Sequence, residues 1–334
     1  EMGDLAFGCF PLARLFRKAP VDIAQELAPQ IEAGGLILRA EAAGPFVNFY
    51  ANPVALLNWT SKAIADGTLY EQAHVSDSQR IMVEFSQPNT HKTFHVGHLR
   101  NVALGDALVR IFRAQGHHVV PVNYYGDFGI DVAKCLWWIE NHTNEPVPKT
   151  GQAAWLGEAY TAANAMLSRD KNDSEEVVAQ KKANFDEVRT ILAGMEGDNV
   201  EMTALYRKTR QWCLDDFKSV YDWLGVHFEH DFFESEMEAP ANVVVDEYLE
   251  KGVFEESDGA IVCHLTPKIK TPAMVRKSDG TSLYMTWDLA LASAKFDAYD
   301  IERSLYVVGT EQKFHFQQLF ATLTKMGYER AKDC

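Results

Sequence analysis

The sequence lacks any run of eighteen or more apolar residues, so it contains no candidate transmembrane helix. Its start, residues 1–17, lacks the basic-then-apolar order of a secretory signal. Its few cysteines are scattered singly, which excludes a paired zinc-binding spacing and a disulfide framework. They are Cys9, Cys135, Cys213, Cys263 and Cys334. We therefore expect a cytoplasmic protein with reduced cysteines and no membrane partner.

Basic residues are scarce relative to acidic ones. The chain has 32 Lys and Arg against 47 Asp and Glu, a net charge of −15 at pH 7. Binding nucleic acid by general attraction requires many basic groups against phosphates, so this composition argues against that class of protein and against DNA as a partner. Local contact with a structured RNA through a few basic and aromatic residues remains open.

The length of 334 residues allows about two domains. Residues 1–75 are typical of a small α+β unit, because helical spacing of apolar residues alternates with short strand patterns. The expected elements are a helix from Pro20 to Gly34-Gly35, two strands within Leu36–Tyr50 around Gly44-Pro45, and a helix over Pro53–Ala65.

Residues 76–334 begin with a strand, a helix and a second strand within about 45 residues. These are Ile81–Phe85, a helix from Gly97 to Gly116, and Val119–Asn123. Such a unit predicts a parallel sheet of the Rossmann type, whose ligands bind beyond the carboxyl ends of the strands. The loop at residues 86–98 is therefore expected at the active-site edge.

The alternation is interrupted between about residues 135 and 235, where the chain is charged and mainly helical. We interpret this stretch as an inserted subdomain, so that the predicted fold is an α/β Rossmann-type domain with a helical or mixed insertion, preceded by the small α+β domain. Later elements are expected as strands at Gly252–Ser257, Ala260–Leu265 and Val275–Tyr284 with a turn at Ser278-Asp279-Gly280, a helix over Thr286–Phe296, a strand at Ser304–Val308 and a helix over Gln312–Met326.

The segment Asn89–Asn101 has the chemistry of a site for a nucleotide triphosphate. The positive end of a helix and free backbone N–H groups favour anions, and Gly97 lets a flat base approach the backbone. His95 and His98 lie three residues apart and can both face one ligand, while Lys92 adds a mobile positive charge. Two alternatives remain: ordinary histidines, or a metal site. The second lacks a third ligand and a His-Glu-x-x-His arrangement, so no metal is expected.

His95-Val96-Gly97-His98 resembles the His-Ile-Gly-His element of class I aminoacyl-tRNA synthetases. The surrounding residues resemble the arginyl-tRNA synthetases more specifically. They are Glu84–Asn89, Lys92, Phe94–Arg100, Gly105–Leu108 and Asn123–Gly129.

Two later segments continue this resemblance. Ser278–Ala290 looks like the arginine-recognising segment of the family, which implies substrate contacts for Tyr284 and Asp288. Four residues apart at a helix start, these side chains can share one face, and a carboxylate can accept a forked guanidinium. Asp288 could instead be a helix N-terminal charge. Tyr306–Phe316 implies that Gly309 lies at the ATP ribose and Gln312 contacts arginine, while His315 could be structural.

The first unit is similar to the appended module of arginyl enzymes that touches the outer corner of the tRNA. Gly44–Phe49 is the matching stretch. Phe46 could stack on an unpaired base and Asn48 could read its edge, although a Phe in an alternating strand is more often a core residue.

The resemblance implies an arginine–tRNA ligase that forms arginyl-adenylate from arginine and ATP and passes arginine to tRNA(Arg). Mg²⁺-bound ATP would be a substrate, with no tightly bound cofactor, and no editing site is expected. Lys92, His95 and His98 would stabilise the transition state. The nucleotide would be seated by Gly97 and Gly309, and arginine would be held by Asn89, Tyr284, Asp288 and Gln312.

The chain departs from the family pattern in several places. It ends at Cys334, before the expected Lys-rich ATP loop and helical anticodon-binding domain, which predicts a fragment that is weak or inactive alone. His91, Thr93 and Trp287 stand where a small residue, Pro and Arg are usual. Two rival hypotheses remain: another class I synthetase or nucleotidyltransferase, and a truncated paralogue that acts as an RNA-binding or partner-binding module.

Overall fold

The computed structural model describes residues 3–70, 75, 77–143, 146–197, 199–267, 269–278, 280 and 283–334. The chain forms two compact units, Glu1–Gln72 and Ala73–Cys334. No helix in the described ranges is both long and apolar enough to cross a membrane. Asp279, in the predicted turn, and Thr281 and Ser282, in the predicted third strand, lie outside the described residues.

The first unit is a three-stranded antiparallel sheet with helices, in the strand order β1-β3-β2. Its small core joins Cys9, Ile23 and Val47. The predicted strand pair and the helix at Pro53 are confirmed. The strand β1 and helix α1 were not predicted. The elements are β1 (Leu5–Gly8), α1 (Phe10–Phe16), α2 (Pro20–Leu27), η1 (Ala28–Gln30), β2 (Ile37–Ala43), β3 (Phe46–Ala51), α3 (Pro53–Ala65) and η2 (Thr68–Tyr70).

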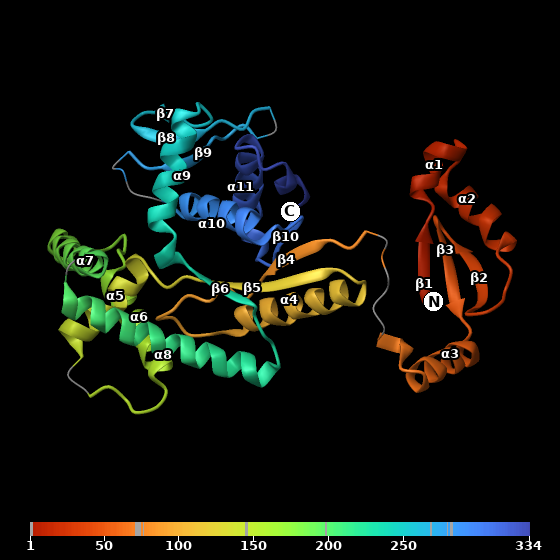
Figure 1. The fold of residues 1–334 in the computed structure, drawn as a ribbon, viewed down its shortest axis with the longest axis horizontal. Coiled ribbons are helices and arrows are strands. Elements are labelled where there is room, and N and C mark those ends of the chain that lie inside the picture. Colours follow the sequence, from red (N-terminus) through yellow and green to blue (C-terminus); the bar gives the residue numbers. More distant parts are fainter. Residues whose placement is uncertain are drawn as a thin grey trace. The chain divides into compact units, whose positions relative to one another are not determined.

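The second unit is built on a four-stranded parallel sheet, in the order β10-β4-β5-β6 (Figure 1). Helix α4 (Val96–Ala114) connects β4 to β5, which confirms the predicted parallel unit. The strands are β4 (Arg80–Glu84), β5 (His118–Tyr125), β6 (His230–Phe233) and β10 (Arg303–Tyr306). Strand β6 was not predicted, because it follows a long helical stretch and has only four residues.

Helices cover both faces of this sheet. Ile81 and Val83 point into a core shared with α4 and with α8 (Val200–Leu224), whereas Met82 points into a core shared with α10 (Tyr284–Tyr299) and α11 (Lys313–Lys325). Figure 1 shows α4 and α8 on one side of the strands and α10 and α11 on the other. This alternation is what a parallel sheet buried on both faces requires.

Between β5 and β6 the chain is mainly helical, as predicted. It forms α5 (Ile130–His142), α6 (Gln152–Leu167), α7 (Glu175–Glu196) and α8. After β6 and η3 (Glu234–Glu236) comes α9 (Glu238–Glu250), which was not predicted, and then an antiparallel sheet of β7 (Glu255–Ser257), β8 (Ala260–Cys263) and β9 (Ala273–Arg276).

The predicted strand over Val275–Tyr284 is wrong at its end. Strand β9 ends at Arg276, and α10 begins at Tyr284, because the Thr286 hydroxyl accepts from the Leu283 N–H and closes the first helical turn. Helix α11 follows η4 (Thr310–Gln312), and η5 (Glu329–Asp333) ends the chain.

Candidate active site

The loop from Phe85 to His95 crosses the carboxyl end of the parallel sheet, from β4 to α4. It lies along the end of β5, where the Gln87 N–H donates to Asn123 Oδ1 (3.0 Å) and the Thr90 N–H donates to the Gly126 carbonyl (2.9 Å). A Cβ at Gly126 would lie 1.9 Å from Asn89 Oδ1. Only glycine at this position therefore lets Asn89 lie over the strand end.

The same loop is held in a strained backbone conformation. Ser86, Gln87 and His91 have φ values of 78°, 48° and 60°, in the left-handed region that non-glycine residues rarely adopt. Helix α8 supports them: the hydroxyls of Ser86 and Tyr221 are 2.7 Å apart, and the His91 N–H donates to Cys213 Sγ at 3.2 Å. Strain of about 1–3 kcal/mol per residue persists only where surrounding contacts enforce it, as at many active sites.

His91 anchors this loop from the inside. Its side chain is 0% exposed, with Nδ1 2.9 Å from Thr90 Oγ1 and Nε2 2.8 Å from Thr209 Oγ1 on α8. Burial lowers the pKa of His91 to about 3. His91 is therefore a neutral ring held between two threonine hydroxyls.

The pKa of His91 predicts an acid-sensitive fold. Below pH 6.5, the ordinary pKa of histidine, His91 binds a proton in the unfolded chain but not in the folded chain. The free energy of unfolding should therefore fall by about 1.4 kcal/mol per pH unit from pH 6.5 toward pH 3. Urea unfolding between about pH 7 and pH 5 measures it. His91→Gln should remove this part of the slope, whereas His227→Gln, at an exposed position, should retain it. Equal slopes in the wild type and His91→Gln would contradict the assignment.

His95 and His98 form a stacked pair at the start of α4. Their ring centroids are 3.9 Å apart. His95 Nδ1 accepts from the Gly97 N–H (3.1 Å), and His98 Nδ1 accepts from the His95 N–H (3.2 Å). A nitrogen that accepts a hydrogen bond carries no proton, so each neutral ring holds its hydrogen on Nε2. Both rings thus keep one N–H donor for a ligand at the positive end of the helix.

The surroundings favour the neutral form of His98. Burial, with smaller contributions from His95 and Lys92, lowers the pKa of His98 to about 4. A Cβ at Gly97 would lie 2.8 Å from the His95 ring. Gly97 therefore leaves space for the His95 ring. This is separate from its predicted role, which is to let a nucleotide base approach the backbone.

Lys92 points toward the start of α5. Its Nζ lies 2.7 Å from Asp131 Oδ2 and 4.9 Å from the centre of the Tyr160 ring. Burial lowers the pKa of Lys92, but the hydrogen bond and charge of Asp131 outweigh burial and leave that pKa raised. Lys134 shares the same carboxylate at 2.9 Å. The ammonium is therefore charged and positioned before any anion arrives.

The start of α10 presents the residues predicted to hold arginine. Tyr284 is 66% exposed, and its ring lies edge-on to Trp287, with centroids 5.7 Å apart. Asp288 Oδ2 lies 2.6 Å from His315 Nε2 on α11. His315 therefore orients the carboxylate, a role that the sequence left open.

Glu234, which the sequence analysis missed, lies where the two groups of residues meet. Burial and the charges of Asp127 and Asp288 raise its pKa to about 8, against the charge of Lys92. The pKa of Tyr284 is also raised overall. Burial and the charge of Glu234 raise it, and the charge of Lys92 opposes them only in part. Glu234 is therefore an acidic centre within electrostatic reach of residues from both predicted groups, Lys92 and Asp288.

Buried Asp127 holds this centre in place. It accepts from the Ser235 N–H (2.9 Å) and hydroxyl (2.7 Å), from the Tyr206 hydroxyl (3.2 Å) and from Arg210 Nε (2.5 Å). Because Ser235 follows Glu234 directly, these bonds position the Glu234 backbone relative to α8.

Other predicted residues lie around this centre or apart from it. A Cβ at Gly309 would lie 2.1 Å from the Glu311 carboxylate, and Gln312 is exposed after β10; within the described ranges, no hydrogen bond joins its side chain to the acidic centre. The Tyr124 hydroxyl, also missed, is buried with no partner among the described atoms, and burial and the charge of Asp288 raise its pKa. Thr93 packs on Gly157 of α6. A Cβ added at Gly157 would lie 2.4 Å from Thr93 Oγ1.

The residues predicted to contact tRNA belong to the first unit. Phe46 is 40% exposed and lies edge-on to Phe10 at 5.6 Å, whereas Asn48 is only 5% exposed on the central strand β3. Phe46 thus offers a ring surface, and Asn48 has little contact with solvent.

No group of three or more His, Cys, Asp or Glu side chains in the described part of the chain could hold a metal ion. All five cysteines are free, and four are buried.

Two family models match the chain. Residues 60–333 match "tRNA synthetases class I (R), catalytic domain", and residues 1–51 match "Arginyl tRNA synthetase N terminal domain". The chain is 41% identical over 334 residues to an arginine–tRNA ligase of Bdellovibrio bacteriovorus, and 37% identical over 335 residues to one of Clostridium beijerinckii. Both comparisons cover the whole of this chain. The chain spans only 56% of the length of the Bdellovibrio bacteriovorus protein and 57% of that of the Clostridium beijerinckii protein.

Solved structures share the fold. The arginyl-tRNA synthetase of Thermus thermophilus matches with a TM-score of 0.69 and 23% identity, over 100% of this chain and 59% of that one. The Plasmodium falciparum arginyl-tRNA synthetase matches with a TM-score of 0.62 and 19% identity, over 97% of this chain and 56% of that one.

Proposed function

The chain belongs to the class I tRNA synthetase family, in its arginyl branch, and we propose on this basis that the protein joins arginine to tRNA(Arg) with ATP. The observation that carries the proposal is the acidic centre at Glu234. Its carboxylate lies within electrostatic reach of Asp288 and Tyr284 on one side and of Lys92 on the other, and 3.5 Å from the position of a Cβ added at Gly126. A cation and a polyphosphate would meet there, as arginine activation requires.

The arginine side chain would bind among the carboxylates. Asp288, oriented by His315, would accept the planar guanidinium, and Glu234 would supply the second charge. Asn89, Tyr284 and Gln312 would hold the rest of the substrate. A neutral or shorter side chain would leave the carboxylates of Asp288 and Glu234 without a cationic partner, which would select for arginine.

Mg²⁺-bound ATP would bind at the start of α4, as a substrate of the reaction. The Nε2–H groups of His95 and His98 would donate to phosphate oxygens, and Lys92 would stabilise charge that develops as the arginine carboxylate attacks the α-phosphate and pyrophosphate leaves. Gly97 and Gly309 would seat the nucleotide. The arginyl group would then pass from the adenylate to the terminal ribose of the tRNA.

The remaining assignments follow the same proposal. Residues 1–75 would contact the tRNA, through Phe46 and with Asn48 beneath the surface, and residues 76–334 would form the catalytic domain with an insertion at about 135–235. We place the protein in the cytosol, where translation takes place.

Titration calorimetry of the chain with arginine, lysine and citrulline tests the proposal. Arginine should bind at least about tenfold tighter than either comparator, because lysine lacks the forked donors and citrulline lacks the charge. Equal affinity for all three would contradict arginine as the substrate. The protein would then be another nucleotide-binding member of the fold. No binding of arginine or ATP would favour an RNA-binding or partner-binding module.

The heat of binding also reports whether arginine reaches Glu234. Below its pKa of about 8 this carboxyl is mostly protonated, and an incoming guanidinium lowers that pKa, so binding near pH 7 should release close to one proton. Affinity should therefore rise as the pH rises toward 8. Buffers with different heats of ionisation measure the released proton, and Glu234→Gln should abolish the release. A release that persists in this variant would place arginine elsewhere.

A further inference from the structure

Three neighbouring strands of the parallel sheet each place one polar side chain at their carboxyl end. These side chains are Glu84 of β4, Tyr124 of β5 and Glu234 directly after β6. Successive side chains of a strand point to opposite faces of a sheet, so each of the three shares a face with the residue two places before it. Those residues are Met82, Val122 and Phe232, which all belong to the core shared with α10. The three polar side chains therefore lie on the face that α10 covers, the helix that carries Asp288.

Glu84 and Tyr124 differ in whether their polar atoms have partners. The Glu84 carboxylate is buried, pairs with buried Lys295 and accepts from Gln87 Nε2 at 2.8 Å. The Tyr124 hydroxyl is buried and has no hydrogen-bond partner among the described residues. A buried polar atom without a partner costs stability, and most such atoms in folded proteins are paired. Because this hydroxyl lies at the ligand-binding edge of a parallel sheet, its missing partner points to a bound substrate.

The surroundings of the Tyr124 hydroxyl keep it protonated. Burial raises the pKa of Tyr124 most, and the charges of Asp288, Glu234 and Glu84 raise it further, in that order. The hydroxyl therefore lies within electrostatic reach of Asp288 and Glu234, the two carboxylates assigned to the guanidinium. A neutral phenol has lone pairs that accept an N–H and a proton that a neighbouring carboxylate can accept. Such a group suits a cation that binds between carboxylates.

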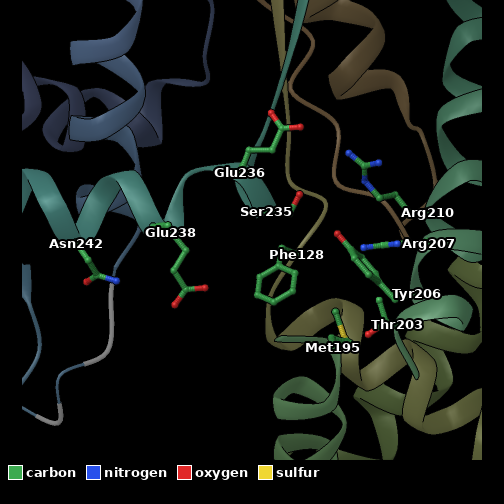
Figure 2. A pocket seen from close by; sticks show the side chains of 11 residues that line it. Phe128, Met195, Thr203, Tyr206, Arg207, Arg210, Ser235, Glu236, Glu238 and Asn242 are labelled. Carbon is green, nitrogen blue, oxygen red and sulfur yellow. The ribbon is translucent and has the colours of Figure 1, made fainter. Parts of the chain in front are cut away.

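A cavity of about 690 Å³ adjoins the acidic centre but is lined by other side chains. Ser235, which directly follows Glu234, lines it together with Phe128 and Tyr206 (Figure 2). Tyr124 is not among the described residues that line it. The unpaired hydroxyl therefore belongs to the row of strand ends and not to this cavity.

We propose that the Tyr124 hydroxyl is a specificity-determining contact for arginine, which accepts one N–H of the guanidinium while Asp288 and Glu234 hold its other N–H groups. The inference rests on the proposed function, in which those two carboxylates bind the guanidinium. A guanidinium spreads its N–H donors over three nitrogens in one plane, whereas a lysine ammonium has all its donors on a single nitrogen. Acceptors placed around a guanidinium plane are therefore not all reached by lysine, and the hydroxyl adds to the selection for arginine.

Titration calorimetry of the whole 334-residue chain and of its Tyr124→Phe variant tests this inference, with lysine measured by competition against arginine. The variant should bind arginine about tenfold more weakly, the effect of losing one hydrogen bond to a charged group. Its affinity for lysine should change less than about twofold, so that the preference for arginine over lysine falls by at least about fivefold. Affinity for ATP should stay within about twofold of the wild type, because the predicted nucleotide groups lie at the start of α4.

Thermal unfolding separates this role from a structural one. Phenylalanine keeps the ring and removes only the unpaired hydroxyl, so the midpoint of unfolding without ligand should stay the same or rise. At a fixed arginine concentration, the rise in midpoint on binding should be smaller in the variant than in the wild type. The matched control is Tyr299→Phe, at the far end of α10, whose ring centroid lies 6.0 Å from that of Phe232, the residue beside Tyr124 in the sheet. It should change arginine affinity less than about twofold.

Three results would overturn the inference. The first is an arginine affinity of Tyr124→Phe within about twofold of the wild type. The second is an equal loss of affinity for arginine and lysine, which would place the hydroxyl at the part that both amino acids share. The third is a midpoint without ligand that falls by more than about 3 °C, which would reveal a structural partner. A wild-type chain that does not distinguish arginine from lysine rejects the proposed function itself, whereas a selective wild type with an equally selective variant rejects only the role of Tyr124.

Discussion

Replacing Asp288 by alanine should lower the affinity for arginine by about 30-fold or more. The variant removes the carboxylate that His315 orients at 2.6 Å, and loss of one partner from a partly buried charge pair costs about 2–5 kcal/mol. Affinity for ATP should change less than about twofold, because the predicted nucleotide groups lie at the start of α4. Titration calorimetry with each ligand measures both values.

The matched control for this variant is Asp297→Ala, on the same helix. Asp297 is exposed, and its carboxylate accepts a hydrogen bond from the Tyr328 hydroxyl at 3.2 Å. Arginine affinity should be retained there. Arginine affinity in Asp288→Ala within about twofold of the wild type would show that this carboxylate does not hold the guanidinium.

Replacing Lys295 by methionine should destabilise the second unit by about 3–5 kcal/mol, because it leaves a buried carboxylate without its counter-ion. Lys295 is 0% exposed and pairs with Glu84 at the end of β4. Its Nζ lies 4.8 Å from the centre of the Tyr306 ring and 5.3 Å from that of Phe232. For a unit of this size, the midpoint of thermal unfolding should fall by roughly 2–4 °C per kcal/mol.

Two further variants separate the charge effect from lost packing. Glu84→Gln combined with Lys295→Met removes both charges, and should recover most of the lost stability because Gln87 Nε2 still donates to that position. Lys218→Met, at an exposed i,i+4 pair on α8, should shift stability by less than about 0.5 kcal/mol. A double variant as unstable as Lys295→Met would mean that packing, and not the unpaired charge, sets the cost.

The elements that could be predicted from sequence are those with strong local signals. Helix α3 begins at Pro53 because Asn52 caps it, accepting from the N–H groups of Val54 and Ala55, and the strand β4 has the apolar run Ile81–Val83 at its centre. Helix α10 was placed two residues late, since its first turn is closed by Thr286, a residue whose type gives no strong helical signal.

Glu234 shows why part of the site could not be predicted. It follows β6, a four-residue strand whose sequence, His230-Asp231-Phe232-Phe233, is too short and polar to stand out after a long helix. Because β6 was not recognised in the sequence, the rule that ligands bind beyond strand ends did not predict a site at Glu234. His315 was left open for a related reason: its contact with Asp288 joins two helices, and no spacing within either helix specifies how they pack.

The helices between β5 and β6 brace the catalytic loop. Thr209, Cys213 and Tyr221, one side of α8, supply the contacts that keep His91 and Ser86 in their strained conformations, and Arg210 reaches Asp127 from the same helix. A stretch of sequence that looks like an accessory inserted into the fold is therefore part of the support of the proposed reaction centre. Shortening or exchanging these helices should alter the geometry of that centre, even though the sequence analysis expected none of their residues to touch a substrate.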